Sequence, residues 1–157
     1  MRKYILIDAT NKIMGRLASQ VAKKALLGQD VVIINAKDVI ISGNKRDILE
    51  KYLDKLKIKT STNPKWGPFH KRRPDTFLRR VIGQMLPRKK IRGKEAMKRV
   101  HVYIGNIPER FKHKYPKLQE EELPNCDKKR LFYYNKYITL ETLCKRIGQS
   151  KKESIEV

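Results

Sequence analysis

Basic and aromatic side chains able to bind a polyanion are concentrated between residues 57 and 99 of this 157-residue chain. The stretch holds fifteen Lys and Arg residues against two acids, so it carries thirteen of the chain's twenty-two net positive charges. Trp66, Phe69 and His70 lie among these charges, in a run without helical or strand periodicity. Because cations neutralise phosphates and flat rings stack on unpaired bases, the pattern favours nucleic acid as the partner.

Two basic clusters in this stretch flank a predicted helix, and both favour RNA over DNA. No segment resembles a groove-entering recognition helix preceded by a partner helix, and zipper and finger motifs are missing. The irregular crevices of structured RNA instead suit a basic segment that becomes ordered on binding. The ring of Trp66 has an alternative place, folded back onto the core. The candidate RNA contacts in this stretch are Lys65, Trp66, His70, Lys71, Arg72, Arg73, Arg88, Lys89, Lys90, Arg92 and Lys94.

A second candidate contact is the predicted helix start within Ser42-Gly43-Asn44-Lys45-Arg46. Two cations in the first turn of a helix oppose its macrodipole, at a cost of a few tenths of a kcal/mol each. A bound phosphate would reverse this effect, because free amides, dipole and cations would then attract the same group. Lys45 and Arg46 are therefore candidate phosphate ligands. The alternative is that both side chains point into solvent.

Asp8 is the one candidate for catalysis, because it ends the first predicted strand at the edge where open α/β sheets bind ligands. The chain lacks the glycine-rich loops of dinucleotide-binding and P-loop proteins, and no Ser/His/Asp or Cys/His set is indicated. A turn or capping role for Asp8 is favoured over a catalytic one. We expect no enzymatic activity, and the alternative function is a small α/β nucleic-acid-modifying or nucleotide-binding enzyme.

The sequence predicts no metal, no cofactor and no membrane segment. Cys126 and Cys144 stand 18 residues apart without a Cys-x-x-Cys motif, and the three histidines are scattered. The two thiols are expected to be reduced and structural, as is usual in the cytosol. No apolar run approaches the roughly 18 residues of a membrane-spanning helix. We therefore expect a cytoplasmic protein.

Strand, helix and strand follow one another at the start of the chain. Residues 4–8 and 31–35 are apolar throughout most of their length, and an i, i+3, i+4, i+7 apolar face runs from Met14 to Ala25. Gly28 is placed to end this helix. Strands without polar alternation are typical of a parallel sheet covered on both faces, so the sequence predicts an α/β fold.

The elements expected after residue 35 have weaker hydrophobic patterns. A short strand is expected at 37–41, followed by a helix that has its apolar face at 48–56 and a cap at Ser42 or Asn44. A second helix is expected from Pro74 to before Pro87, and a short one at 93–99. A final buried strand is expected at 100–104, and a helix capped by Thr139 is expected at 140–147. Residues 106–136 show no periodicity and carry several prolines, which predicts a long peripheral excursion. We expect a single domain, with an α/β core in residues 1–105 that includes the basic segment 57–99, and the excursion and C-terminal helix in 106–157.

Ordered motifs spread over about 100 residues resemble the universal large-subunit ribosomal protein thirteen family in its archaeal and eukaryotic form. They are Asp8-Ala9, Gly15-Arg16-Leu17-Ala18-Ser19, Asn35-Ala36, Ser42-Gly43-Asn44-Lys45, Gly67-Pro68-Phe69-His70-x-Arg72-x-Pro74, Met85-Leu86-Pro87, Gly93-x-x-Ala96 and Val102-Tyr103-x-Gly105. One departure is that Gln84 separates Gly83 from Met85, where the family usually has Gly directly before Met-Leu-Pro. This predicts a shifted helix end or an inserted residue.

The resemblance implies a three-layer α/β/α domain around a small, mainly parallel sheet. It implies a structural role in the large ribosomal subunit, binding its RNA during assembly beside neighbouring large-subunit proteins, and no enzymatic activity. Location in the cytoplasmic ribosome follows, and no homo-oligomer is expected. Matched by position, the family adds Arg16 to the candidate RNA contacts and supports Lys45, His70, Arg72 and the basic cluster after Pro87.

Overall fold

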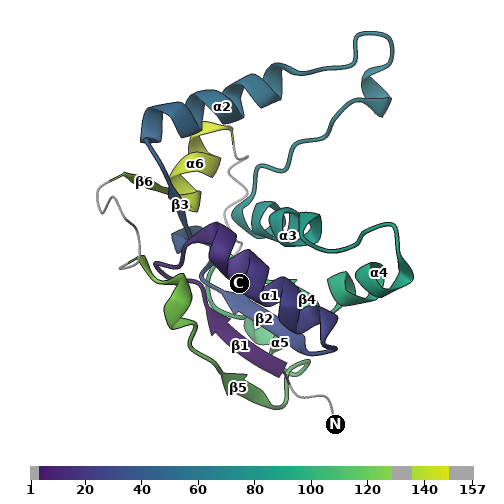
Figure 1. Ribbon diagram of the computed structural model, residues 1–157, viewed down its shortest axis with the longest axis vertical. Coiled ribbons are helices and arrows are strands. Elements are labelled where there is room, and N and C mark those ends of the chain that lie inside the picture. The colour runs from purple at the N-terminus through teal and green to yellow at the C-terminus, as the bar shows by residue number, and fades with distance from the viewer. Residues whose placement is uncertain (1–3, 129–135, 149–157) are drawn as a thin grey trace.

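The computed structural model describes residues 4–128 and 136–148, and its centre is a four-stranded sheet in which every pairing is parallel (Figure 1). The strand order is β4-β2-β1-β5. The strands are β1 Tyr4–Asp8, β2 Asp30–Ile34, β4 Val100–Val102 and β5 Leu118–Glu120. The expected α/β class with a small, mainly parallel central sheet is confirmed.

The unit β1–α1–β2 forms as its apolar pattern predicts. Helix α1 spans Met14–Leu26 and buries Leu17, Ala18 and Val21 on the face turned to the sheet. Gly28 follows with a φ of +92°, a left-handed conformation that ends a helix at little cost for glycine. Strands β1 and β2 then pair in register, with Ile5 opposite Val31.

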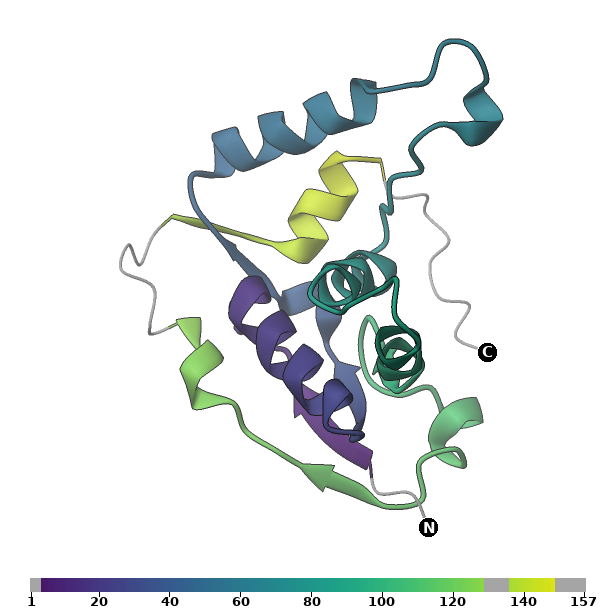
Figure 2. The same ribbon diagram turned by 45° about the vertical axis from the view of Figure 1, so that its right-hand side comes forward.

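Different segments pack on the two faces of the sheet, so the fold has three layers with the sheet in the middle. Helix α1 packs on one face together with α3, Pro74–Gln84, and α4, Ile91–Lys98 (Figure 2). The other face is covered by the segment that carries the short helix α5, Glu109–Lys112. From this segment the buried Tyr115 meets Tyr4 and His101 edge to face, with ring centroids 5.0 and 5.7 Å apart.

A second, two-stranded sheet lies beside the first and differs from the sequence prediction. The strand expected at 37–41 is a 3-10 turn, η1 at Ala36–Asp38, followed by β3 at Ile40–Ser42. Asn35 enters the turn in a left-handed conformation with a φ of 56°, which breaks the extended backbone. Strand β3 pairs antiparallel with β6, Tyr137–Thr139, and helix α6, Leu140–Arg146, follows with Thr139 as its cap.

The strand expected at 100–104 is shorter and is not the last one. After Val102 the chain turns toward η1, where the carbonyls of Tyr103 and Ile104 accept hydrogen bonds from the amides of Ala36 and Lys37. Strand β5 comes later and pairs with β1 on the far side of the sheet. The segment after residue 105 therefore supplies one strand to each sheet, which its lack of periodicity did not predict.

The core is apolar throughout the described residues, and both cysteines lie in it. Cys126 and Cys144 are free thiols with fully buried side chains. Burial raises the pKa of the Cys144 thiol to about 12 and moves that of Cys126 in the same direction. Because the thiolate is the reactive form, both groups are packing residues.

Candidate nucleic-acid interface

Helix α2, Lys45–Lys57, begins after a turn that is shaped by two residues of the Ser42–Arg46 motif. Gly43 has a φ of +129°, and the Asn44 side chain accepts a hydrogen bond from the amide of Arg46, so Asn44 and not Ser42 is the cap. Lys45 and Arg46 are exposed. Asp47 also lies in the first turn, where its carboxylate complements the dipole that the two cations oppose.

Helix α2 is only half packed. Its apolar face, including Ile48, Leu49 and Tyr52, lies against the core without any fully buried side chain. The Tyr52 ring meets that of Phe77 at 5.4 Å. The helix thus carries the following segment away from the two sheets (Figure 1).

That following segment, residues 58–73, is called the arm here, and it holds five Lys or Arg residues and no acid. Its one ordered turn is η2, Pro64–Trp66. The Asn63 side chain accepts from the amide of Lys65 and its carbonyl accepts from the amide of Trp66, both at 3.1 Å. Local hydrogen bonds of this kind shape a turn without any apolar core.

The two hydrophobic aromatic side chains of the arm point into solvent. Trp66 is 84% exposed and Phe69 is 66% exposed. The alternative in which Trp66 folds back onto the core is therefore wrong. Large rings held in water are typical of surfaces that bind a partner.

Three arginines connect the arm to the rest of the protein, at α3 and just after α6. The Arg80 guanidinium on α3 donates to the carbonyl of Phe69 at 2.9 Å. Arg72 donates to the carbonyl of Gly148, just after α6, at 3.5 Å, and Arg73 pairs with Asp75 at 3.0 Å. By contrast, the exposed side chains of Lys65 and Lys71 have no hydrogen-bond or ionic partner among the described residues.

His70 is the least accessible of the predicted contacts. Its side chain is half-buried, and within the described part of the chain its Nε2 is buried without a hydrogen-bond partner. An RNA contact through this ring thus requires either its other nitrogen or a shift of the arm.

Helix α3 separates the arm from the second basic cluster. Pro74 stands at its first turn, Leu78 and Ile82 are fully buried, and Met85 follows as the C-terminal cap residue. The α4 cluster, defined as Arg88, Lys89, Lys90, Arg92 and Lys94, comes after this helix end, and all five side chains are exposed.

Helix α4 starts at Ile91, two residues earlier than expected, because Gly93 belongs inside it. A Cβ at position 93 would lie 2.2 Å from the carbonyl oxygen of Pro87, so only glycine lets the two backbones meet there. This contact fixes the turn that presents the α4 cluster.

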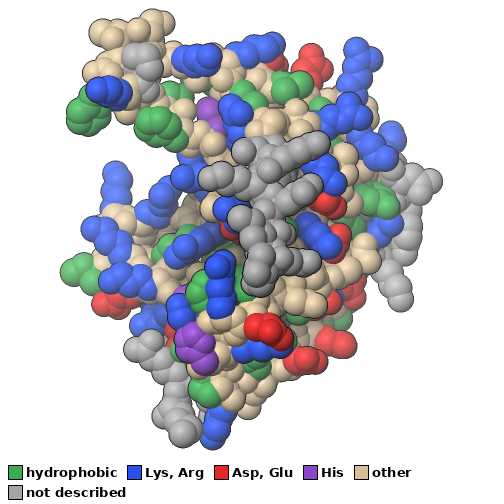
Figure 3. All heavy atoms as spheres, turned by 180° about the vertical axis from the view of Figure 1, so that it is seen from behind, with side chains coloured by type: hydrophobic (Ala, Val, Ile, Leu, Met, Phe, Trp, Pro, Cys, Tyr) green, Lys and Arg blue, Asp and Glu red, His purple; other side chains and the backbone are tan. Residues whose placement is uncertain are grey.

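The structure spreads the predicted contacts over several ends of helices instead of gathering them in one pocket. With a rise of 1.5 Å per residue, the two ends of α2 lie about 18 Å apart and the two ends of α3 about 15 Å apart, so each helix separates the contacts at its start from those at its end. Arg16 lies on another element, in the first turn of α1. In the space-filling view the molecule is hollowed between the projecting arm and the Lys- and Arg-rich region below it (Figure 3).

Asp8 has the surroundings of a turn residue. Its Oδ1 accepts from the backbone amide and the hydroxyl of Thr10, at 3.0 and 2.7 Å, and from the side-chain amide of Asn35 at 3.0 Å. Burial raises the pKa of Asp8, but these hydrogen bonds outweigh it and leave the pKa below its usual value. An ionised carboxylate whose bonds shape the β1 turn is a structural group.

The sequence did not select Arg80, and it noted the Phe69 ring among the charges without including it in the list of RNA contacts; both residues contribute to this surface. Phe69 is exposed beside Trp66, and Arg80 holds the arm through its hydrogen bond. The position of Arg80, on the polar side of an amphipathic helix that follows a basic run, is a signal that could have identified it.

The described residues include neither a membrane-spanning helix nor a metal-binding cluster. No helix among residues 4–128 and 136–148 is long and apolar enough to cross a bilayer. Within the same ranges, no group of three or more His, Cys, Asp and Glu side chains is placed to hold a metal ion.

Comparison with known proteins assigns the chain to a family. The model of the family described as ribosomal protein L13 matches residues 2–109. A protein of Methanocaldococcus jannaschii named large ribosomal subunit protein uL13 is 43% identical over 149 residues, covering 91% of this chain and 96% of that protein. Proteins of the same name from Methanopyrus kandleri and Caenorhabditis elegans are 40% and 38% identical, covering 93% of this chain and 87% and 70% of their own lengths.

Proposed function

The chain belongs to the ribosomal protein L13 family, and from this premise we propose that it is a structural component of the large ribosomal subunit that binds and stabilises the subunit's RNA during assembly. Its place is then the ribosome, with large-subunit RNA and neighbouring large-subunit proteins as partners. The family consists of structural proteins, so no catalytic step is assigned, and the enzyme alternative finds no support in the hydrogen bonds of Asp8.

The arm is the observation that carries the proposal. Five cations without an acid and two exposed rings project from the body on a half-packed helix. Such a segment repels itself until a polyanion neutralises it, and its rings gain from stacking on unpaired bases. RNA supplies both kinds of group.

The proposed contacts divide by what each can do. Arginines offer planar pairs of donors to phosphates, lysines offer point charges, and the Trp66 ring offers a stacking face. The wide spacing of the clusters suits an RNA surface of several strands. The proposed RNA contacts are Arg16, Lys45, Arg46, Lys65, Trp66, His70, Lys71, Arg72, Arg73, Arg88, Lys89, Lys90, Arg92 and Lys94.

Sedimentation tests the assignment to the subunit. The full-length protein is expected to migrate with large subunits in a sucrose gradient and to remain with them through a moderate salt wash. Recovery only at the top of the gradient would contradict the proposed function.

Salt titration tests the electrostatic mechanism. If about eight phosphates are neutralised, affinity for deproteinised large-subunit RNA should fall roughly 10⁴-fold between 50 and 200 mM salt. Fluorescence of the single tryptophan provides a signal from the arm itself, and we expect it to be quenched on binding. Binding that hardly depends on salt would refute this mechanism.

A further inference from the structure

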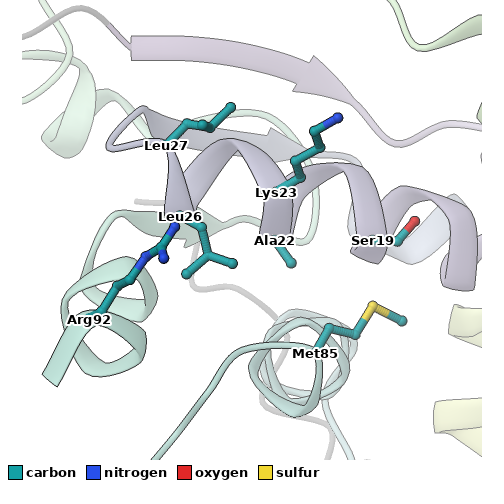
Figure 4. Close-up of a pocket in the computed structure, with 7 residues that line it drawn as sticks. All are labelled: Ser19, Ala22, Lys23, Leu26, Leu27, Met85 and Arg92. Atoms are coloured by element: carbon teal, nitrogen blue, oxygen red, sulfur yellow. The ribbon is translucent and has the colours of Figure 1, made fainter. Parts of the chain in front are cut away.

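A groove with an aliphatic lining lies between α1 and the region where α3 ends and α4 begins (Figure 4). Its volume is about 500 Å³. Leu26 and Ala22 point from α1 toward this region, and Arg92 extends from α4 toward Leu26. Met85 and Leu27 also line the groove, which we call the α1–α4 groove.

The groove leaves aliphatic surface in water that the core does not use. Leu27 is 69% exposed and Met85 is 43% exposed. Covering apolar surface is worth about 25 cal/mol per Å², so an occupant with an apolar face would be favoured here.

The charges around the groove have one sign. Its charged lining residues are Lys23 and Arg92, and neither side chain has an acidic partner among the described residues. Arg92 also belongs to the α4 cluster, so the positive rim continues into the proposed RNA-binding surface. The occupant must therefore combine an apolar face with negative charge.

We propose that the α1–α4 groove takes a single unstacked nucleotide of the bound RNA, with its base against Leu26 and Met85 and its phosphate near Lys23 or Arg92. This inference rests on the proposed function and adds a site to it. A guanidinium stacks on a base, and a thioether sulfur is attracted to the edge of an aromatic ring. Neither interaction reads a particular base, so the site is selective for an unpaired nucleotide more than for its sequence.

The size of the groove favours a nucleotide over a protein partner. A volume of about 500 Å³ lies in the range of small-molecule sites, roughly 300–1,000 Å³. A stable protein interface buries at least about 1,200 Å² in total, so a protein partner would have to extend well beyond the seven residues that line this groove.

A pair of matched truncations tests the groove. Met85 is 43% exposed and Leu118 is 39% exposed, but Leu118 lies on β5, outside the groove and outside the proposed RNA contacts. At constant salt, Met85→Ala should bind deproteinised large-subunit RNA about three- to tenfold more weakly, whereas Leu118→Ala should bind as the unchanged protein does. Both variants should unfold at nearly the same denaturant concentration as the parent. Equal affinities for the two variants would overturn the inference.

Crosslinking identifies the occupant. Large subunits are isolated from cells grown with the photoreactive analogue photo-methionine, irradiated and compared with subunits that carry Met85→Leu. The inference expects one reverse-transcription stop that disappears in the variant. A crosslink from position 85 to a protein, or no crosslink, would overturn it. Co-sedimentation of the chain with large subunits in either case leaves the proposed function standing.

Discussion

The arm and the central sheet differ in what holds each of them in place. In the sheet, Val31, Val32 and Ile33 are fully buried, and the backbone of β2 is bonded on both sides. In the arm, a few hydrogen bonds and one ion pair connect the chain to the neighbouring elements, and the rings of Trp66 and Phe69 face water. The comparison shows that the residues that stabilise the core and the residues proposed to bind RNA are different ones, so each set can be changed without the other.

The largest effect should come from a core truncation that leaves the arm unchanged. Leu78 on α3 is fully buried, so Leu78→Ala should lower the free energy of unfolding by about 2–5 kcal/mol. Urea denaturation followed by circular dichroism measures this change. Under conditions where the variant is still folded, its RNA affinity should match that of the parent, and a large loss of affinity there would break the separation.

The second effect is the reverse case, a change in the arm that spares the fold. Arg72→Ala with Arg73→Ala removes one long hydrogen bond and one exposed ion pair, which are worth little to stability. RNA affinity should fall about ten- to a hundredfold, and the slope of log affinity against log salt should become shallower by about 1.4–1.8. The measurements are filter binding across a salt series and thermal unfolding. A marked drop in Tm would mean that these arginines are structural.

A third substitution tests a position where the packing of the fold meets the proposed binding surface. Gly93→Ala places a methyl group against the Pro87 carbonyl and should cost about 1–3 kcal/mol of stability. Gly105→Ala is the matched control, because a Cβ at that position meets nothing within 4 Å. Since the clash lies next to the α4 cluster, Gly93→Ala should also weaken RNA binding. Equal unfolding curves for the two variants would show that the turn adapts freely.

The smallest effect concerns pH and the second face of the sheet. Burial, with the nearby Arg79 and Lys114 cations, lowers the pKa of His101 below its usual 6.5, against the opposing influence of Asp30. A depressed folded-state pKa means that stability is highest above pH 6.5 and declines as pH falls through that value toward the folded pKa. His101→Gln should flatten the unfolding free energy between pH 7.5 and 5.5, and an unchanged slope would assign the pH dependence to other groups.

The parallel core could be predicted because its signals are local and repeated. Three or more consecutive apolar residues in β1 and β2, separated by a clear helical face in α1, admit few other arrangements. Strand β5 lacked such a signal. Its residues Leu118–Glu120 are all exposed, and they pair with β1 through backbone atoms that any sequence supplies. The predicted division at residue 105 stays a prediction.

The candidate interface was predictable in composition and less so in geometry. Charge density alone identified the arm and the α4 cluster. The orientation of Trp66 depends on whether tertiary contacts offer its ring a pocket, and that information is not local. The α1–α4 groove joins side chains seventy positions apart, from Ala22 to Arg92, so no spacing rule reveals it.

The strand order also determines how long the edge of one strand stays unpaired while the chain is synthesised. Strand β1 lies second from the edge of the sheet, and its outer neighbour β5 is made only when residues 118–120 have been translated. At a translation rate of about 5–20 residues per second, β5 is synthesised roughly 5–20 s after β1, and the outer edge of β1 is unpaired until then. During that interval the nascent chain presents an unpaired apolar strand edge, the kind of surface that invites pairing between chains. Chains released before residue 118 should therefore aggregate more readily than chains released shortly after residue 120.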